Sequence, residues 1–211
     1  MRKLVSLFSL TLLLQTFPNI LQAQTPVNPI QQALDAGLMS NYPDGQFHPE
    51  RKVMRAELAA IVVKTFQLEK RDTQQNPPVA ITDVPPSHWA YNDIAIVLET
   101  GIMSGYRDGM FYPDRPVTRA EGFAIFAQAF GVLLFDEADV SSILSQYPDA
   151  AEIPDWARQA MATALFEGLV NVRPNNSLSP LEPMTRADIA YSLSRYLAKQ
   201  ENPGTIPDLP M

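Results

Sequence analysis

The strongest constraint on this chain's fold is one segment that occurs three times. The central copy, residues 101–121, reads GIMSGYRDGMFYPDRPVTRAE. Residues 37–57 match it at 13 of 21 positions, and residues 168–188 keep a glycine, two prolines and a Thr-Arg-Ala triplet. A periodic chain is an array of one supersecondary unit whose copies cannot each bury an apolar face alone. We therefore expect three units that share one core.

Apolar residues at helical spacing flank each copy. Residues 55–66 carry an i, i+3, i+4, i+8 apolar stripe that starts at Leu58, and this stripe predicts a helix with one buried face. The other expected helices cover residues 30–36, 90–100, a short stretch near 140–144, a stretch ending at 167, and the segments after Thr118 and Thr185. Each unit is then helix, loop, helix, and the fold class is mainly α.

The first 23 residues have the pattern of a secretory signal peptide. Arg2 and Lys3 precede an apolar run from Leu4 to Leu14, and the segment ends at the small residue Ala23. A membrane anchor is the alternative, but the run is well short of the ~20 apolar residues that a span needs. We expect a secreted protein of the cell envelope, in the cell wall or periplasm, without a transmembrane span after cleavage.

The repeats and the breaks between them predict how the chain is divided. The expected segments are a signal peptide over 1–23, a first unit with a truncated head over 24–68, a linker over 69–80, a second unit over 81–131, a connecting segment over 132–146, a third unit over 147–200 and a Pro-rich tail over 201–211.

Composition argues against several classes of function. The formal charge is −7, or −9 without Arg2 and Lys3, so nucleic acid is not an expected partner. There is no cysteine, and the two histidines, His48 and His88, occupy non-equivalent positions with no nucleophile motif beside them. One aspartate per loop lacks the alternating oxygens of a calcium site. We expect no catalytic residues, no metal and no cofactor.

The motifs of the second unit resemble the S-layer homology motif. They are Asp83-Val84, His88-Trp89-Ala90, Gly101-Ile102, Gly105-Tyr106, Asp108-Gly109, Phe111, Pro113 and Thr118-Arg119-Ala120-Glu121. The resemblance covers residues 28–199 as three tandem units. It implies a pseudo-three-fold helical bundle with loop prongs, and grooves between neighbouring units that bind wall-linked polysaccharide, often with acidic groups such as a pyruvate ketal.

Thr118 and Glu121 form the pattern of a capping box, in which each side chain satisfies a backbone N–H of the other residue. The pattern does not explain Arg119, since a cation at a helix N-terminus is disfavoured by a few tenths of a kcal/mol. Arg55 and Arg186 repeat this placement. A guanidinium beside first-turn amides suits a ligand carboxylate. The alternative is an arginine paired with an acid of the neighbouring unit.

The aromatic residues of the repeats divide into two kinds. Phe47 and Phe111 are expected to plug the loops. Trp89 and Trp156 could lie in the core or stack on a sugar face. The predicted ligand-binding residues are Arg119, Arg186, Arg55, Trp89, Trp156, Tyr106, Asp83, Gly105 and Glu121. Three equal sites are not expected, because Tyr42 and Tyr106 are matched by Arg173 in the third unit.

Our leading hypothesis is a non-catalytic module that anchors to the cell wall by binding acidic polysaccharide between its units. An envelope structural or adaptor protein that recruits another envelope protein is the alternative, since no effector segment follows the three units. A glycosidase would need a defined carboxylate pair, and the sequence nominates none.

Overall fold

The computed structural model describes residues 28–71, 80–131, 133 and 135–201. Its helices are α1 (Pro29–Asp35), α2 (Arg55–Phe66), α3 (Tyr91–Glu99), α4 (Arg119–Phe130), α5 (Glu137–Leu144), α6 (Arg158–Phe166) and α7 (Arg186–Glu201). Across these ranges only isolated bridges occur in place of strands. The prediction of a mainly helical chain is confirmed. The expected signal peptide, most of the expected linker and nearly all of the tail lie outside the described residues.

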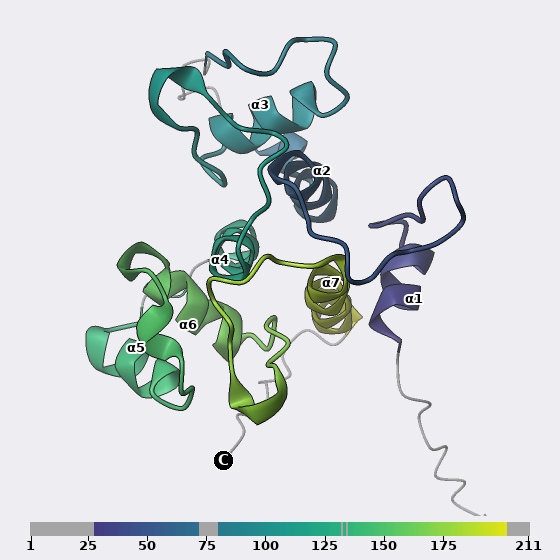
Figure 1. The fold of residues 1–211 in the computed structure, drawn as a ribbon. Helices are drawn as coiled ribbons and strands as arrows, with labels where there is room; N and C mark the ends of the chain where they lie inside the picture. Colours follow the sequence, from purple (N-terminus) through teal and green to yellow (C-terminus); the bar gives the residue numbers. More distant parts are fainter. Residues whose placement is uncertain (1–27, 72–79, 132, 134, 202–211) are drawn as a thin grey trace, which may run out of the picture.

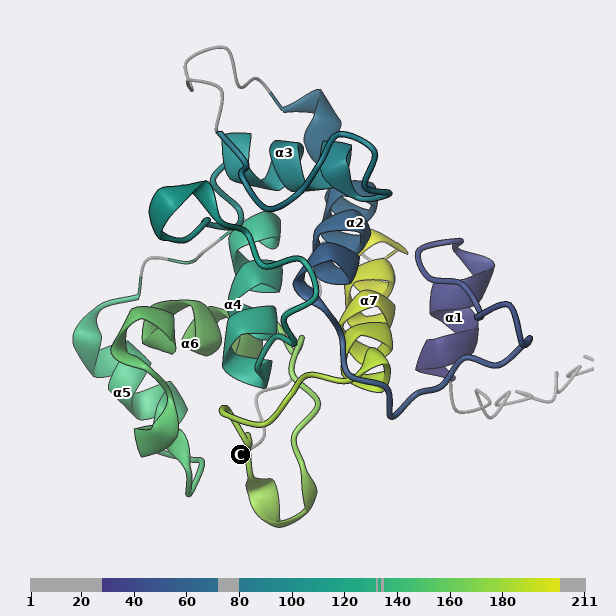
Figure 2. The same ribbon diagram turned by 45° about the horizontal axis from the view of Figure 1, so that its top comes forward.

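The second helices of the three units form the centre of the molecule. Figure 1 looks along α2, α4 and α7, and Figure 2 shows them running alongside one another. Each packs against the first helix of the next unit: α2 against α3, α4 against α6, and α7 against α1. The third unit therefore returns to the first, which confirms the expected closed pseudo-three-fold bundle. The additional helix α5 lies against α6.

A ring of backbone hydrogen bonds closes the bundle just before the central helices begin. The Val53 amide donates to the Met184 carbonyl at 2.9 Å, and the Met184 amide donates to the Val117 carbonyl at 2.9 Å. The Val117 amide donates to the Val53 carbonyl at 3.0 Å, which completes the ring. Each unit therefore donates to one neighbour and accepts from the other, so buried loop amides are satisfied without a sheet.

The first amides of the central helices are also satisfied by neighbouring units. Arg55 N donates to the Arg115 carbonyl, Arg119 N to the Glu182 carbonyl and Arg186 N to the Arg51 carbonyl, at 2.8–3.0 Å. A helix start normally leaves such amides without an intrahelical partner. Here they hold adjacent loops in place, so they are not free to receive a ligand anion.

Aromatic side chains fill the bundle and its loops. Phe66 of α2 packs edge-on against Phe126 and Tyr196, with ring centroids 6.0 and 5.0 Å away, and joins all three central helices near their C-terminal ends. Phe47 and Phe111 are buried within the loops. The prediction that these two phenylalanines plug the loops is confirmed.

Candidate ligand grooves between the units

Two grooves of the same construction lie between neighbouring units. The first groove has a volume of about 840 Å³, and its lining includes Tyr42, Arg51, Glu57, Trp89 and Arg186. The second groove has a volume of about 460 Å³, and its lining includes Arg55, Gly105, Tyr106, Glu121 and Trp156. Each groove combines the loop and α2 or α4 of one unit, the tryptophan of the next unit and the helix-start arginine of the preceding unit. The repeat thus places several predicted site residues together twice.

The helix-start arginines are buried and bind the loop of the following unit. Arg55 donates from Nε to the Phe111 carbonyl and from Nη2 to the Ser104 carbonyl, both at 2.8 Å. Arg186 makes the equivalent bonds at 2.9 Å to Phe47 and 2.6 Å to Ser40. It also forms an ion pair with Glu57, the carboxylate of the unit that it clamps. These bonds explain why arginine stands at a helix start: carbonyl oxygens of the neighbour surround the cation.

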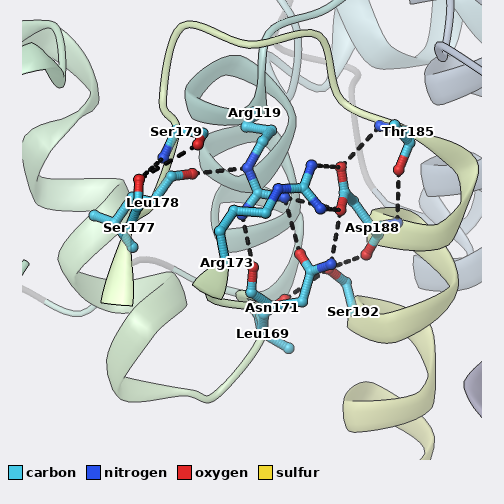
Figure 3. A network of polar contacts seen from close by, with 10 residues as sticks. All are labelled: Arg119, Leu169, Asn171, Arg173, Ser177, Leu178, Ser179, Thr185, Asp188 and Ser192. Atoms are coloured by element: carbon cyan, nitrogen blue, oxygen red, sulfur yellow. Dashed lines mark hydrogen bonds and ion pairs between the residues drawn. The ribbon is translucent and has the colours of Figure 1, made fainter. Parts of the chain in front are cut away.

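Arg119 is the most enclosed of the three, with 0% of its surface exposed. Its guanidinium donates to the Leu178 carbonyl at 2.7 Å and to the Asn171 carbonyl at 2.7 Å, and it lies 2.8 Å from Asp188 (Figure 3). The alternative of pairing with an acid of the neighbouring unit therefore describes Arg119 and Arg186. A direct ligand contact by Arg119 would require this network to open.

The Arg119–Asp188 pair is held away from water. Burial lowers the pKa of Arg119, although a guanidinium stays protonated in proteins. Burial alone would raise the pKa of Asp188, but Arg119, the Thr185 amide, Asn171 and Arg173 together keep that pKa below its usual value. A buried pair of this kind is costly to break, because removing one member leaves an uncompensated charge.

Each groove is lined by a tyrosine whose ring lies close to two guanidinium groups. The Tyr42 ring lies 4.4 Å from the Arg51 guanidinium carbon and 4.7 Å from that of Arg186. In the second groove, the Tyr106 ring lies 4.9 Å from Arg55. Arg115, outside the groove lining, lies 5.2 Å from the same ring, and it also donates from Nη1 to the Tyr106 hydroxyl and from Nη2 to Glu121. These distances are within the range of cation–π attraction.

Arg51 and Arg115, unlike the helix-start arginines, are exposed. Sequence reasoning missed both, because it looked for cations only at helix starts. The signal was present, since both arginines occupy one position of the repeat.

Both tryptophans are on the surface, with 67% of Trp89 and 65% of Trp156 exposed. The alternative that Trp89 and Trp156 lie in the core is therefore wrong. Each indole borders a groove, Trp89 the first and Trp156 the second. An exposed indole beside an open groove offers a flat apolar face with a polar N–H at its edge.

Asp83 holds its own loop. Its carboxylate accepts the Phe111 amide at 2.7 Å and the Tyr112 amide at 2.6 Å. Asp149 does the same in the third unit, accepting the Leu178 amide at 2.9 Å and the Ser179 amide at 2.7 Å. The predicted ligand role of Asp83 would compete with these bonds.

The capping box predicted at Thr118 and Glu121 is confirmed, because the Glu121 amide donates to Thr118 Oγ1 and the Thr118 amide donates to Glu121 Oε2. Within the described part of the chain, no group of three His, Asp or Glu side chains is arranged to hold a metal ion. A search of the same residues found no helix with the length and hydropathy of a membrane span.

Comparison with known proteins identifies the repeat. The S-layer homology domain matches residues 25–59, 80–121 and 146–190. A surface-layer 125 kDa protein of Lysinibacillus sphaericus is 31% identical over 171 residues, which are 80% of this chain and 14% of that relative. A cellulosome-anchoring protein of Acetivibrio thermocellus is 30% identical over 164 residues, which are 78% of this chain and 36% of the relative. This chain thus spans well under half the length of either relative. With three matches in tandem, the chain belongs to the S-layer homology domain family.

Proposed function

We propose that this chain is a non-catalytic anchoring module of the cell envelope, which binds acidic wall-linked polysaccharide in the first and second grooves. The observation that carries the proposal is the pair of exposed tryptophans, Trp89 and Trp156, at equivalent edges of two arginine-bearing grooves. The names of the relatives, a surface-layer protein and a cellulosome-anchoring protein, support the same class of function.

The chemistry of the grooves fits an acidic sugar polymer. The exposed indole face suits the apolar face of a sugar ring, and the guanidinium groups suit carboxylates. The chain as a whole has a formal charge of −7, so arginines gathered in two grooves offer local attraction for an anion on a chain of net negative charge.

The division of the chain into units over 24–68, 81–131 and 147–200 is part of this proposal. The three matched segments fall largely within these bounds, which supports the division. The grooves lie where two such units meet, so each site needs residues from different units.

The test is co-sedimentation of the purified chain with host wall sacculi, before and after their covalently attached polymers are stripped. We expect binding that stripping abolishes. Replacing both Trp89 and Trp156 by alanine should weaken binding roughly tenfold or more, since each aromatic stacking contact contributes about 1 kcal/mol.

Leu181→Ala is the control for this experiment, because Leu181 is exposed and lines neither groove. It should bind as the unchanged chain does. A folded chain that stays in the supernatant with intact sacculi would contradict anchoring and direct attention to a partner protein.

A further inference from the structure

In the second and third units, the segment in front of the first helix is bonded to the loop of its own unit. An aspartate of that segment, Asp83 or Asp149, accepts two successive loop amides. In the second unit the Thr82 amide also donates to the Gly109 carbonyl at 2.9 Å. This head segment, residues 80–84, therefore covers one edge of the second loop.

The loop of the first unit has the same backbone conformation at the corresponding points. The Tyr42 amide donates to the Gln46 carbonyl at 2.9 Å, as the Tyr106 amide does across the second loop at 2.7 Å. His48 has φ of 52°, and Tyr112, which occupies the equivalent position of the second unit, has φ of 58°. The first loop is thus already shaped like a loop that binds a head segment.

The amides of Phe47 and His48 correspond to the pair that Asp83 binds in the second unit. Among the residues that the structure describes, neither amide has an acceptor. Phe47 also keeps 8% of its surface exposed, whereas Phe111, its equivalent under the head segment, keeps 0%. Backbone N–H groups beside a nearly buried residue are normally paired. The first loop therefore presents two adjacent donors that suit one carboxylate.

There is room for a segment beside these donors. In the second unit a Cβ added to Gly109 would lie 2.8 Å from the Ala80 carbonyl oxygen, so only glycine allows the head segment to approach this closely. A Cβ added to Gly45, the equivalent glycine of the first loop, would meet no atom of the described residues within 4 Å. The same approach is therefore open at the first loop.

The chain itself does not supply a matching segment. At the spacing of the repeat, Thr82 and Asp83 correspond to Pro18 and Asn19, which lie outside the described residues and within the predicted signal peptide. Proline has no amide N–H and asparagine has no carboxylate. Asp83 and Asp149, in this chain or in a second copy, are bound to their own loops. The matching segment must therefore come from another polypeptide.

We propose that the first-loop edge, residues 44–48, is a docking site for an extended segment of another polypeptide, in which an aspartate is followed by an aliphatic residue. The carboxylate accepts the Phe47 and His48 amides in charge-assisted hydrogen bonds. The aliphatic residue takes the place of Val84, which follows Asp83 and is buried. This inference goes beyond anchoring, because it gives the module a place to hold a protein.

Amide NMR spectra of the labelled chain, titrated with a peptide of residues 80–86 (AITDVPP) with blocked ends, test this inference. We expect saturable shifts of the Phe47 and His48 amides. The amides that Asp83 binds should not shift, because attachment to the same chain gives Asp83 a high effective concentration. The Asp83→Ala form of the peptide should bind about tenfold more weakly, since its charge-assisted hydrogen bonds are lost.

Two glycine variants of the chain test the position of the docked segment. Gly45→Ala should weaken peptide binding about tenfold, because its Cβ would clash with the segment. Gly37→Ala is the matched control: φ is 65° at Gly37 and 79° at Gly45, and neither added Cβ meets an atom of the described residues within 4 Å. Gly37→Ala should bind the peptide as the unchanged chain does. Circular dichroism of both variants verifies that they are folded.

Several results would overturn the inference. Absence of shifts at millimolar peptide, equal binding of the Asp83→Ala peptide, or undiminished binding by folded Gly45→Ala would each do so. Equal shifts with sodium acetate would show that the two amides bind any small carboxylate and do not select a peptide. All of these results leave the proposed wall anchoring standing, since co-sedimentation with sacculi tests it separately.

Discussion

At the scale of single residues, Asp83 shows how a recurrent polar position can maintain a site without facing it. Replacing Asp83 by alanine would leave the amides of Phe111 and Tyr112 without their acceptor. We expect the free energy of unfolding to fall by about 1–3 kcal/mol, the usual cost of an unsatisfied buried group. Tyr112 has φ of 58°, a conformation that non-glycine residues adopt only when held, so loop order should decrease as well.

Urea unfolding of Asp83→Ala beside Asp114→Ala would measure this effect. Asp114 is an exposed aspartate two residues after Tyr112, and its replacement should change stability by no more than about 0.5 kcal/mol. Equal midpoints for the two variants would show that the carboxylate does not hold the loop. The equivalent variant Asp149→Ala should behave like Asp83→Ala, because Asp149 accepts the matching pair of amides.

Arg119 illustrates how much of the candidate site can be predicted from single residues of the sequence. Its position at a helix start and its lack of a capping role are visible in the sequence, and so are both alternatives for its partner. The partner itself, Asp188, lies 69 residues further along the chain. Only closure of the bundle brings the two together, and no local pattern encodes that distance.

At the scale of elements, α4 and the segment before α7 are fitted to each other. The repeat places Gly122 where the other central helices carry Leu58 and Ile189, and Met184 where the other units carry Val53 and Val117. A Cβ added to Gly122 would lie 2.0 Å from Met184 Sδ. The longer methionine therefore occupies the volume that the glycine leaves empty.

Gly122→Ala should destabilise the chain for this reason. Alanine gains about 1 kcal/mol of helix propensity over glycine, but overpacking a buried site costs about 1–3 kcal/mol. Met184→Val, which restores the residue of the other two units, should remove the clash, so Gly122→Ala should become neutral or stabilising in that background. A double-mutant cycle of unfolding free energies measures the coupling, and strictly additive changes would contradict this packing account.

Element bounds follow closely from apolar spacing, whereas contacts between units do not. The helix predicted over residues 55–66 is α2, and the one predicted over 90–100 is α3 shortened by a residue at each end. In contrast, the backbone ring through Val53, Val117 and Met184 joins segments more than 60 residues apart. Apolar periodicity specifies which face a helix buries, but not which neighbour receives it.

At the scale of the whole molecule, closure depends on carboxylates that are ionised in the folded state. Asp188 holds α7 to α4 through Arg119, and Asp149 holds the third loop. Burial alone would raise the pKa of both carboxylates. Hydrogen-bond donors outweigh this effect at Asp149, and hydrogen-bond donors together with Arg119 and Arg173 outweigh it at Asp188. The pKa of each carboxylate is therefore lowered in the folded state. A lowered folded pKa adds stability above the unfolded value of about 3.9, and that stability is lost as pH falls through the folded pKa.

We therefore expect the free energy of unfolding to change little between about pH 7 and pH 5 on account of these groups, and to fall steeply below about pH 4. Asp188→Asn should be about 3–5 kcal/mol less stable at pH 7, because it leaves Arg119 buried without its counterion. Its stability should also vary less between about pH 4 and pH 2, since the titrating carboxylate is gone. Urea unfolding across this pH range, with the exposed Asp155→Asn as control, measures both effects. If the unfolding free energies of Asp188→Asn and the unchanged chain varied with pH in parallel, this carboxylate would have no role in acid stability. If Asp155→Asn also differed from the unchanged chain, the pH dependence would come from surface carboxylates instead.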